Sequence, residues 1–279
     1  MQPILKNGLA SIAVAAMTTC AALADGHQDL GDYVVEALTN TLMAGDADRV
    51  TDYFSPDYIN HNPSVSDGPE PLQGLASKLQ PVGGLQGEIV RVIVDGDTVA
   101  LHSRWDNAGP TPLIGFDVFR TEDGMIVEHW DNLTPVAGFN PSGRSQIDGH
   151  TEVTDLDKTE DNRALVVELI TKGFINGDDI SYADYINPNM YFQHNSSIAD
   201  GLDGLGAALQ SGLSMQYTTI HQTVAEGNFV LTMSEGTLND DAKAFYDLFR
   251  LKDGLIVEHW DVIADMPDPD AETNASGKF

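Results

Sequence analysis

Apolar side chains recur at helical spacing near the start of each half of the chain. In the first half they lie at Val34, Val35, Leu38 and Leu42. Intervals of three and four residues place such side chains on one face of a helix, and Gly45 is suited to end it. Residues 165–170, followed by Gly177, show the same pattern. We therefore expect each half to open with an amphipathic helix.

Later in each half, the helical spacing is replaced by an alternation of apolar and polar residues. It predicts antiparallel strands, because successive side chains of a strand point to opposite faces of the sheet. The first half is expected to contain helices at 47–54 and 71–79 and strands at 58–62, 88–94, 98–105, 114–121 and 125–133. The second half is expected to contain a helix at 205–213 and strands at 191–195, 219–225 and 229–235. Helices followed by a run of strands indicate an α+β fold, in which one curved sheet wraps around the helices.

The two halves share a long segment of nearly identical sequence. Residues 123–131 read Asp-Gly-Met-Ile-Val-Glu-His-Trp-Asp, and residues 253–261 differ from them only by Leu at the third position. Further repeats pair Asp-Val-Phe-Arg at 117–120 with Asp-Leu-Phe-Arg at 247–250, Asn-His-Asn at 60–62 with Gln-His-Asn at 193–195, and Asp-Gly at 67–68 with Asp-Gly at 200–201. The chain is therefore a tandem duplication of one domain. A duplicated core needs to retain only apolar residues, whereas this one retains acids and histidines as well.

Composition narrows the possible functions. The chain has 279 residues, with 43 acids against 14 Lys and Arg and a net charge of −29 when histidines are neutral. Such a charge repels phosphate backbones and anionic lipid headgroups. We therefore expect neither a nucleic-acid partner nor a role at a membrane surface.

Residues 1–24 have the pattern of a secretory signal peptide. A basic start at Lys6 precedes an apolar run over residues 9–23, and small residues lie just before the expected cleavage after Ala24. Cleavage there removes Cys20, the only cysteine. We expect a periplasmic or secreted protein with no membrane contact after cleavage, and an uncleaved anchor is the alternative.

The patterns divide the chain into five segments. They are the signal peptide at 1–24, a first domain at 28–137, a linker at 138–157, a second domain at 158–265 and an acidic disordered tail at 266–279. Each domain has an ordinary size for one hydrophobic core. The tail is assigned as disordered because it is acidic, contains proline and has few apolar residues.

The repeated motifs resemble a known family. Asp-x-Phe-Arg and Asp-Gly-x-Ile-Val-Glu-His-Trp-Asp, with His-Asn and Asp-Gly upstream, are similar to the SnoaL-like polyketide cyclase family of the nuclear transport factor 2-like superfamily. The resemblance implies two tandem cone-shaped α+β barrel domains, in each of which a curved mixed sheet wraps on helices around a pocket. It leaves the reaction open, because that superfamily includes isomerases, dehydratases, epoxide hydrolases and non-catalytic members.

The resemblance also implies which side chains line the pocket. By comparison with ketosteroid isomerases, His129 and Asp131 share the pocket face of the last strand, and Asp117 occupies the place of an acid that donates a hydrogen bond to a developing enolate. The candidate catalytic residues of the first pocket are Asp117, His129, Asp131, His61 and His102. Those of the second pocket are His194, Asp247, His259 and Asp261.

These residue types suit proton transfer at carbon. A carboxyl group against apolar walls is pushed toward its neutral form, and a histidine near its midpoint can move a proton either way. The chemistry would be an aldol-type cyclisation or an isomerisation of a small apolar carbonyl compound. A metal site would need His61, His102, His129 and Asp131 to converge, but no close histidine spacing supports one. We expect no metal and no cofactor.

Two alternatives stay open. In the first, the pockets bind a small molecule in the periplasm without changing it. In the second, His129 and Asp131 only bond each other or the backbone, and the protein is an assembly module with filled cones. An enzyme should show displaced titrations of its acids and histidines, whereas a carrier should show ordinary ones.

The opposite face of the last strand carries a different set of residues. Arg120 and Arg250 are expected to form ion pairs with Glu128 and Glu258 across their hairpins. Trp130 and Trp260 share that face, which predicts that the repeats pack sheet to sheet as an intrachain pseudo-dimer.

The repeats differ at one point that affects the chemistry. His102-Ser-Arg-Trp105 in the first becomes Met233-Ser-Glu-Gly236 in the second. The second pocket thereby loses an imidazole, a cation and a large ring. If His102 points inward, the first pocket is the more reactive.

Overall fold

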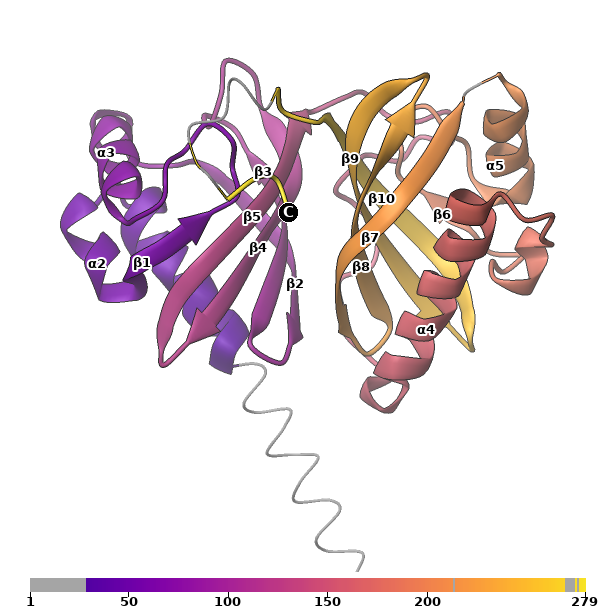
Figure 1. Ribbon diagram of the computed structural model, residues 1–279, viewed down its shortest axis with the longest axis horizontal. Helices are drawn as coiled ribbons and strands as arrows, with labels where there is room; N and C mark the ends of the chain where they lie inside the picture. The colour runs from indigo at the N-terminus through magenta and orange to yellow at the C-terminus, as the bar shows by residue number, and fades with distance from the viewer. Residues whose placement is uncertain (1–28, 213, 269–273, 275) are drawn as a thin grey trace, which may run out of the picture.

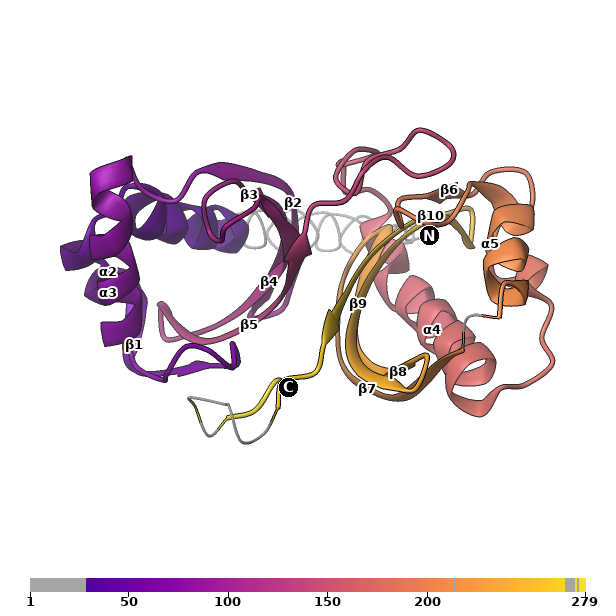
Figure 2. The same cartoon turned by 90° about the horizontal axis from the view of Figure 1, so that it is seen from above.

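The computed structural model describes residues 29–212, 214–268, 274 and 276–279. The predicted signal peptide lies outside these residues. The described chain forms two units, each a five-stranded sheet curved around helices (Figures 1 and 2). This confirms the α+β class and the two tandem cone-shaped domains. Among the described helices, none is long and apolar enough to cross a membrane.

The first domain opens with helical residues 29–38. Its other helical segments are η1 (Thr39–Met43), η2 (Ala47–Arg49), α2 (Val50–Tyr53), α3 (Glu70–Leu79) and η3 (Gln80–Val82). Its strands are β1 (Phe54–Asn60), β2 (Gly87–Asp95), β3 (Thr98–Trp105), β4 (Leu113–Glu122) and β5 (Met125–Pro135). The sheet order is β1-β5-β4-β3-β2, with β1 parallel to β5 and the other pairs antiparallel.

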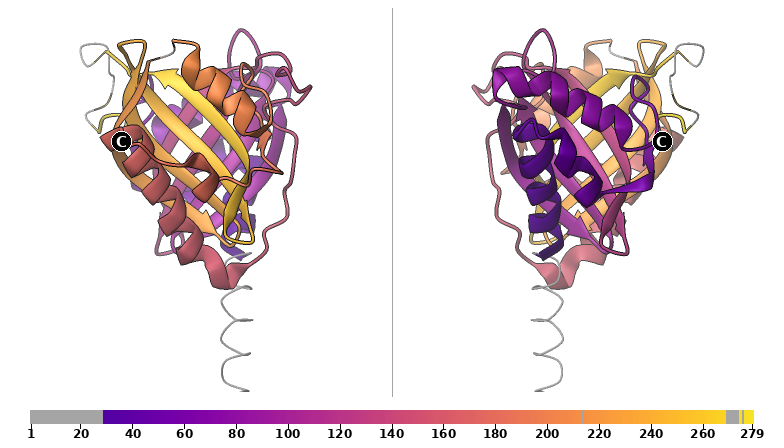
Figure 3. Two further views of the ribbon diagram at one scale, coloured as in Figure 1. Left: turned by 90° about the vertical axis from the view of Figure 1, so that its right-hand side faces the viewer. Right: turned by 90° about the vertical axis from the view of Figure 1, so that its left-hand side faces the viewer.

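The second domain repeats this arrangement. Its helical segments are η4 (Leu156–Lys158), α4 (Thr159–Leu169), η5 (Ile170–Asn176), η6 (Tyr182–Asp184) and α5 (Gly201–Gln210). Its strands are β6 (Phe192–Gln193), β7 (Met215–Glu226), β8 (Phe229–Leu238), β9 (Asp241–Lys252) and β10 (Leu255–Asp265). The order β6-β10-β9-β8-β7 matches that of the first sheet strand for strand. The helices lie over the concave faces, at the two far ends of the molecule (Figure 3).

The convex faces of the two sheets pack against each other. Trp130, Phe116 and Val118 of the first sheet share one buried cluster with Trp260 and Leu248 of the second. Because side chains alternate along each strand, these residues point away from the cone interiors. The intrachain pseudo-dimer predicted from the two tryptophans is therefore present in this chain, with the sheets back to back (Figure 1).

The predicted ion pairs are also present on these faces. Nε of Arg120 lies 2.8 Å from Oε2 of Glu128, and Nε of Arg250 lies 2.8 Å from Oε2 of Glu258. They connect β4 with β5 and β9 with β10. Both arginines therefore have the structural role expected of them.

The expected disorder of the tail does not hold for its described residues. Nδ2 of Asn274 donates to the carbonyl oxygens of Asn60, Asn62 and Val65. Lys278 is buried, with 8% of its surface exposed. Composition alone was misleading for these residues, because Asn274 and Lys278 form hydrogen bonds with the first domain.

Candidate functional site

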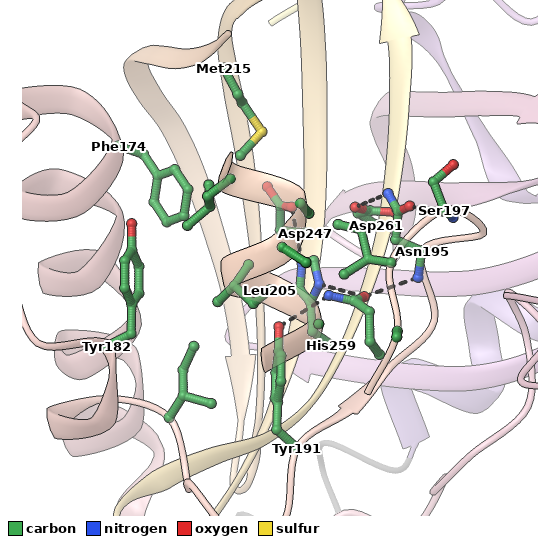
Figure 4. Close-up of a pocket in the computed structure, with 18 of the residues that line it drawn as sticks. Phe174, Tyr182, Tyr191, Asn195, Ser197, Leu205, Met215, Asp247, His259 and Asp261 are labelled. Carbon is green, nitrogen blue, oxygen red and sulfur yellow. Dashed lines mark hydrogen bonds and ion pairs between the residues drawn. The ribbon is translucent and has the colours of Figure 1, made fainter. Parts of the chain in front are cut away.

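A cavity of about 520 Å³ lies inside the second domain, between the sheet and the helices (Figure 4). Most of its wall is apolar, with Phe174, Leu205 and Met215 among the lining residues. Asp247 on β9 and Asp261 on β10 line it from the sheet side, together with His259. None of the described residues that line this cavity is Lys or Arg. The cavity is therefore an apolar chamber with acids and an imidazole on one wall.

The protonation of His259 follows from its hydrogen-bond partners. Its Nδ1 lies 3.0 Å from Oε1 of Gln193, and its Nε2 lies 3.1 Å from Oδ1 of Asp247. The Gln193 oxygen also accepts the backbone N–H groups of His194 and Asn195. It is therefore fixed as an acceptor, and Nδ1 of His259 must carry a proton. A second proton is then shared between Nε2 and the Asp247 carboxylate.

The charges around His259 favour the imidazolium form. Burial lowers the pKa of His259, but the hydrogen bond to Asp247 and the negative charges of Asp261 and Asp247 outweigh it, so the pKa is raised overall. The hydroxyl of Tyr217 donates to Oδ2 of Asp247 at 3.0 Å. Asp247 thus accepts from two sides, which suits a carboxylate paired with a charged imidazole.

Asp261 is the second acid of the chamber. Burial raises its pKa, and the like charge of Asp247 adds to this, against the opposing effects of His259 and of the Asn195 hydrogen bond. Nδ2 of Asn195 donates to both carboxylate oxygens, at 3.0 and 2.7 Å. Asp261 is therefore held in place by an amide rather than by a cation, and it retains more basicity than an exposed aspartate.

The first domain contains the same trio in a tighter setting. Nε2 of His129 lies 3.4 Å from Oδ1 of Asp117, and Nδ2 of Asn62 donates to Oδ2 of Asp131 at 2.5 Å. Asp131 also has a cation beside it, because Nζ of Lys278 lies 3.6 Å from its Oδ1. The sequence therefore placed Asp117, His129 and Asp131 on one face correctly, as it did Asp247, His259 and Asp261.

An aromatic ring covers the buried acid in each domain, but from a different strand. Nε1 of Trp105 on β3 donates to Asp117 at 3.1 Å. The residue that pairs with Trp105 on the neighbouring strand, β2, is Gly87. In the second domain Tyr217 on β7 donates to Asp247. The residue that pairs with Tyr217 on the neighbouring strand, β8, is Gly236. The glycine and the ring have exchanged strands between the repeats. Tyr217 was missed by sequence reasoning, because aligned positions do not show the exchange.

His61 and His194 are not pocket residues, although the sequence predicted both as catalytic. Nε2 of His61 lies 2.9 Å from Oε1 of Glu128, and its ring stacks on Trp130 at 4.8 Å. Nε2 of His194 lies 3.0 Å from Oε1 of Glu258 on the equivalent outer face. A one-residue step along each strand reverses the face, so the pocket positions belong to Asn60 and Gln193 instead.

His102 also points away from the first pocket. Its Nδ1 lies 3.0 Å from Nη1 of Arg91, its ring stacks on Phe116, and it lies near Trp260 between the two sheets. Burial lowers its pKa, and the charge of Arg91 adds to this. The expectation that His102 makes the first pocket more reactive is therefore wrong. The cavity lies in the second domain, and its described lining residues belong to that domain apart from Pro141 of the linker.

Each trio also offers ligand atoms for a metal ion. The donor atoms of Asp117, His129 and Asp131 lie within 4.8 Å of one another, and so do those of the second trio. Both ring nitrogens of His259 already bond protein groups, so an ion there would have to displace the Asp247 contact. Elemental analysis of protein purified without chelator is the direct measurement.

Two asparagines contact the pocket acids, although they were not among the predicted site residues. Asn62 and Asn195 occur in the repeated His-Asn motif. The motif was assigned to the histidine, whereas the asparagine is the residue that reaches the pocket acid. The sequence could have indicated these asparagines, because the same polar residue is retained in both repeats.

Comparison with known families confirms the resemblance. A SnoaL-like domain model matches residues 35–129, within the first repeat. The second repeat carries the same motifs and the same sheet order. A comparison with curated proteins gave no match.

Several solved structures are similar to part of the chain. TsrD from Streptomyces laurentii is 20% identical over 38% of this chain and 86% of that chain, with a TM-score of 0.30. An LEH-like epoxide hydrolase of M. tuberculosis is 26% identical over 38% of this chain and 84% of that chain, with a TM-score of 0.33. A protein with a ketosteroid isomerase-like fold from Catenulispora acidiphila is 19% identical over 35% and 82%, with a TM-score of 0.30.

Proposed function

We propose that the cavity of the second domain binds a small, uncharged, apolar carbonyl compound and catalyses cofactor-free proton transfer at carbon. The observation that supports this is the trio of Asp247, His259 and Asp261 on one wall of an otherwise apolar chamber. The chamber has no Lys or Arg to receive a phosphate or carboxylate among its described lining residues. An anionic ligand would also meet two acids there, so it is disfavoured.

The residues divide the proton transfer between them. The Asp261 carboxylate takes a proton from the carbon next to the carbonyl, and the C–H electron pair forms the C=C bond of an enol. The carbonyl oxygen receives the proton shared by His259 and Asp247. Return of a proton to a different carbon gives isomerisation. Attack of the enol carbon on a second carbonyl of the same molecule gives an aldol-type ring closure.

Solvent deuterium exchange tests this without knowledge of the natural substrate. A panel of apolar cyclic ketones is incubated with the full chain in D₂O, and label entering next to the carbonyl is followed by NMR. We expect exchange above the buffer rate, reduced about 100-fold or more by Asp261→Asn, because positioned acid–base groups contribute on that order. The matched control is Asp131→Asn in the first domain, which should retain the rate. Equal loss in both variants, or no exchange with any ketone, would contradict the proposal.

The alternative is a non-catalytic binding protein. It is favoured by the hydrogen bonds that already engage Asp261 through Asn195 and Asp247 through Tyr217. A ketone that binds the second domain, detected by NMR shift changes, but shows no exchange with solvent deuterium would select this function.

We also propose that the protein is exported, on the pattern of residues 1–24. Cell fractionation with N-terminal sequencing of the mature protein tests this. A chain that begins at Asp25 in the periplasmic or secreted fraction is the expected result, and an intact N-terminus in the membrane fraction would support the uncleaved anchor.

A further inference from the structure

The linker and the tail share a short sequence. Residues 140–144 read Asn-Pro-Ser-Gly-Arg, and residues 274–278 read Asn-Ala-Ser-Gly-Lys. Each copy follows the last strand of its own repeat. The duplication therefore extends beyond the sheets to a segment that the alternation of apolar residues does not mark.

Each copy binds the other domain through its asparagine. Nδ2 of Asn140, which follows the first domain, donates to the carbonyl oxygens of Gln193 and Ile198 at 2.6 and 2.9 Å. Nδ2 of Asn274, which follows the second domain, donates to the carbonyl oxygens of Asn60 and Val65 at 2.7 and 3.0 Å. The acceptors are equivalent in the two repeats, because Asn60 aligns with Gln193 through the His-Asn motif.

The serine of each copy contacts the equivalent aspartate, but through a different bond. Oγ of Ser142 accepts the backbone N–H of Asp200 at 2.9 Å, whereas Oγ of Ser276 donates to the Asp67 carboxylate and lies 3.2 Å from its Oδ2. The following glycines, Gly143 and Gly277, have φ values of 80° and 72°. A left-handed backbone at this point favours glycine over other residues.

The copies diverge at the basic residue. Nε of Arg144 pairs with Asp200 at 2.8 Å, whereas Nζ of Lys278 lies beside Asp131 in the first trio. Nδ1 of His61 bonds the carbonyl oxygen of Gly277 at 3.0 Å, whereas Nδ1 of His194 bonds that of Ser145, two residues after the equivalent glycine, at 2.7 Å. The asparagine is therefore the residue whose contacts are the same in both copies.

We propose that the loops at residues 60–67 and 193–200 are two copies of a binding site for an Asn-x-Ser-Gly-basic peptide. The site of the second domain is occupied by the linker, and the site of the first domain is occupied by Asn274 and residues 276–278 of the tail. The asparagine amide supplies the selectivity, because in each copy it donates to two carbonyl oxygens of the loop that it binds. The first site can be emptied by truncation after Thr273, which leaves the linker intact.

Binding in trans tests the proposal. A variant truncated after Thr273 is titrated with a synthetic peptide of residues 273–279, and NMR shifts of residues 60–67 are followed. We expect saturable binding, weakened tenfold or more in a peptide with the change Asn274→Ala, because each lost hydrogen bond contributes about 1 kcal/mol. The full chain should not bind at the same peptide concentration, because its own tail fills the site. The proposal would be overturned if the unchanged peptide and the Asn274→Ala peptide bound equally well. It would also be overturned if the truncated variant folded but bound no peptide.

A second measurement decides the matter if the truncated variant does not fold. Hydrogen exchange is compared in full chains that carry Asn274→Ala or Asn140→Ala. The first change should accelerate exchange tenfold or more at residues 60–67 and leave 193–200 unchanged, and the second should do the reverse. Unchanged exchange at both loops would refute a role for the asparagine.

Discussion

The same residue type has different chemistry at two places in this molecule. His259 is held between Gln193 and Asp247, with Asp261 nearby, and its pKa is raised although burial opposes this. His102 is buried beside Arg91, and its pKa is lowered by burial and by that positive charge. Sequence identifies each as a histidine, but only the surrounding charges decide whether it holds a proton at neutral pH.

The charge on His259 predicts a measurable pH dependence. Because the pKa of His259 in the folded protein is raised above 6.5, the usual value for histidine, its contribution to stability is complete below that pH and is lost as the pH rises through the folded pKa. NMR of ¹⁵N-histidine protein should show His259 titrating above 6.5. His102 should stay neutral to well below that value. In Asp247→Asn, the titration of His259 should move downward; an unmoved midpoint would contradict the proposed shared proton.

At the scale of elements, each repeat pairs a glycine with an aromatic residue across one hairpin, but the two residues lie on opposite strands in the two repeats. A hypothetical Cβ on Gly236 would lie 2.1 Å from the carbonyl oxygen of Gln216, and one on Gly87 would lie 2.0 Å from that of Arg104. In both hairpins the glycine has no side chain, so the neighbouring strand can approach closely at the position of its aromatic residue. The ring then reaches the buried acid, from Tyr217 on β7 or from Trp105 on β3.

Gly236→Ala should therefore be costly. The methyl group meets backbone rather than a flexible side chain, so the strands must separate, at a cost of about 1–3 kcal/mol in the free energy of unfolding. The same displacement moves the Tyr217 hydroxyl off Asp247. Gly206→Ala on α5 is the matched control, because the only atom near its Cβ is Nε2 of Gln210 at 3.9 Å. Urea unfolding should show a loss for the first and a neutral or slightly stabilising effect for the second, and similar losses would refute the close-approach argument.

The fold was largely predictable from the sequence, and the site only in part. Alternation along β5 and β10 correctly put His129 with Asp131, and His259 with Asp261, on one face, because a strand has a strict period of two. The resemblance to ketosteroid isomerases indicated that this face lines the pocket. The prediction for His61 and His194 was wrong, because they lie where β1 and β6 end, one residue beyond the inward-facing Asn60 and Gln193. The cavity itself was not predictable, because alternation does not resolve how side chains pack.

At the scale of the whole molecule, the two sheets are joined by Arg91 as well as by apolar packing. This side chain has 2% of its surface exposed, and its guanidinium lies 4.1 Å from the Trp260 ring centroid. It donates to the linker carbonyl oxygens of Ile147, Asp148 and His150. Burial lowers the pKa of Arg91 to about 10, so it is still charged at neutral pH. One buried cation therefore connects the first sheet, the linker and the second sheet.

Replacing this cation should weaken the whole assembly rather than one domain. Arg91→Met keeps most of the apolar stem but leaves linker carbonyl oxygens buried without their donor, which costs about 3 kcal/mol. The control is Arg104→Met on β3, whose ion pair with Asp106 is well exposed and should contribute less than about 1 kcal/mol. Unfolding is followed by tryptophan fluorescence, because Trp130 and Trp260 lie between the sheets. The midpoint of the transition should move to lower urea in Arg91→Met and stay nearly unchanged in Arg104→Met. An unshifted transition in Arg91→Met would show that Arg91 is not needed to join the repeats.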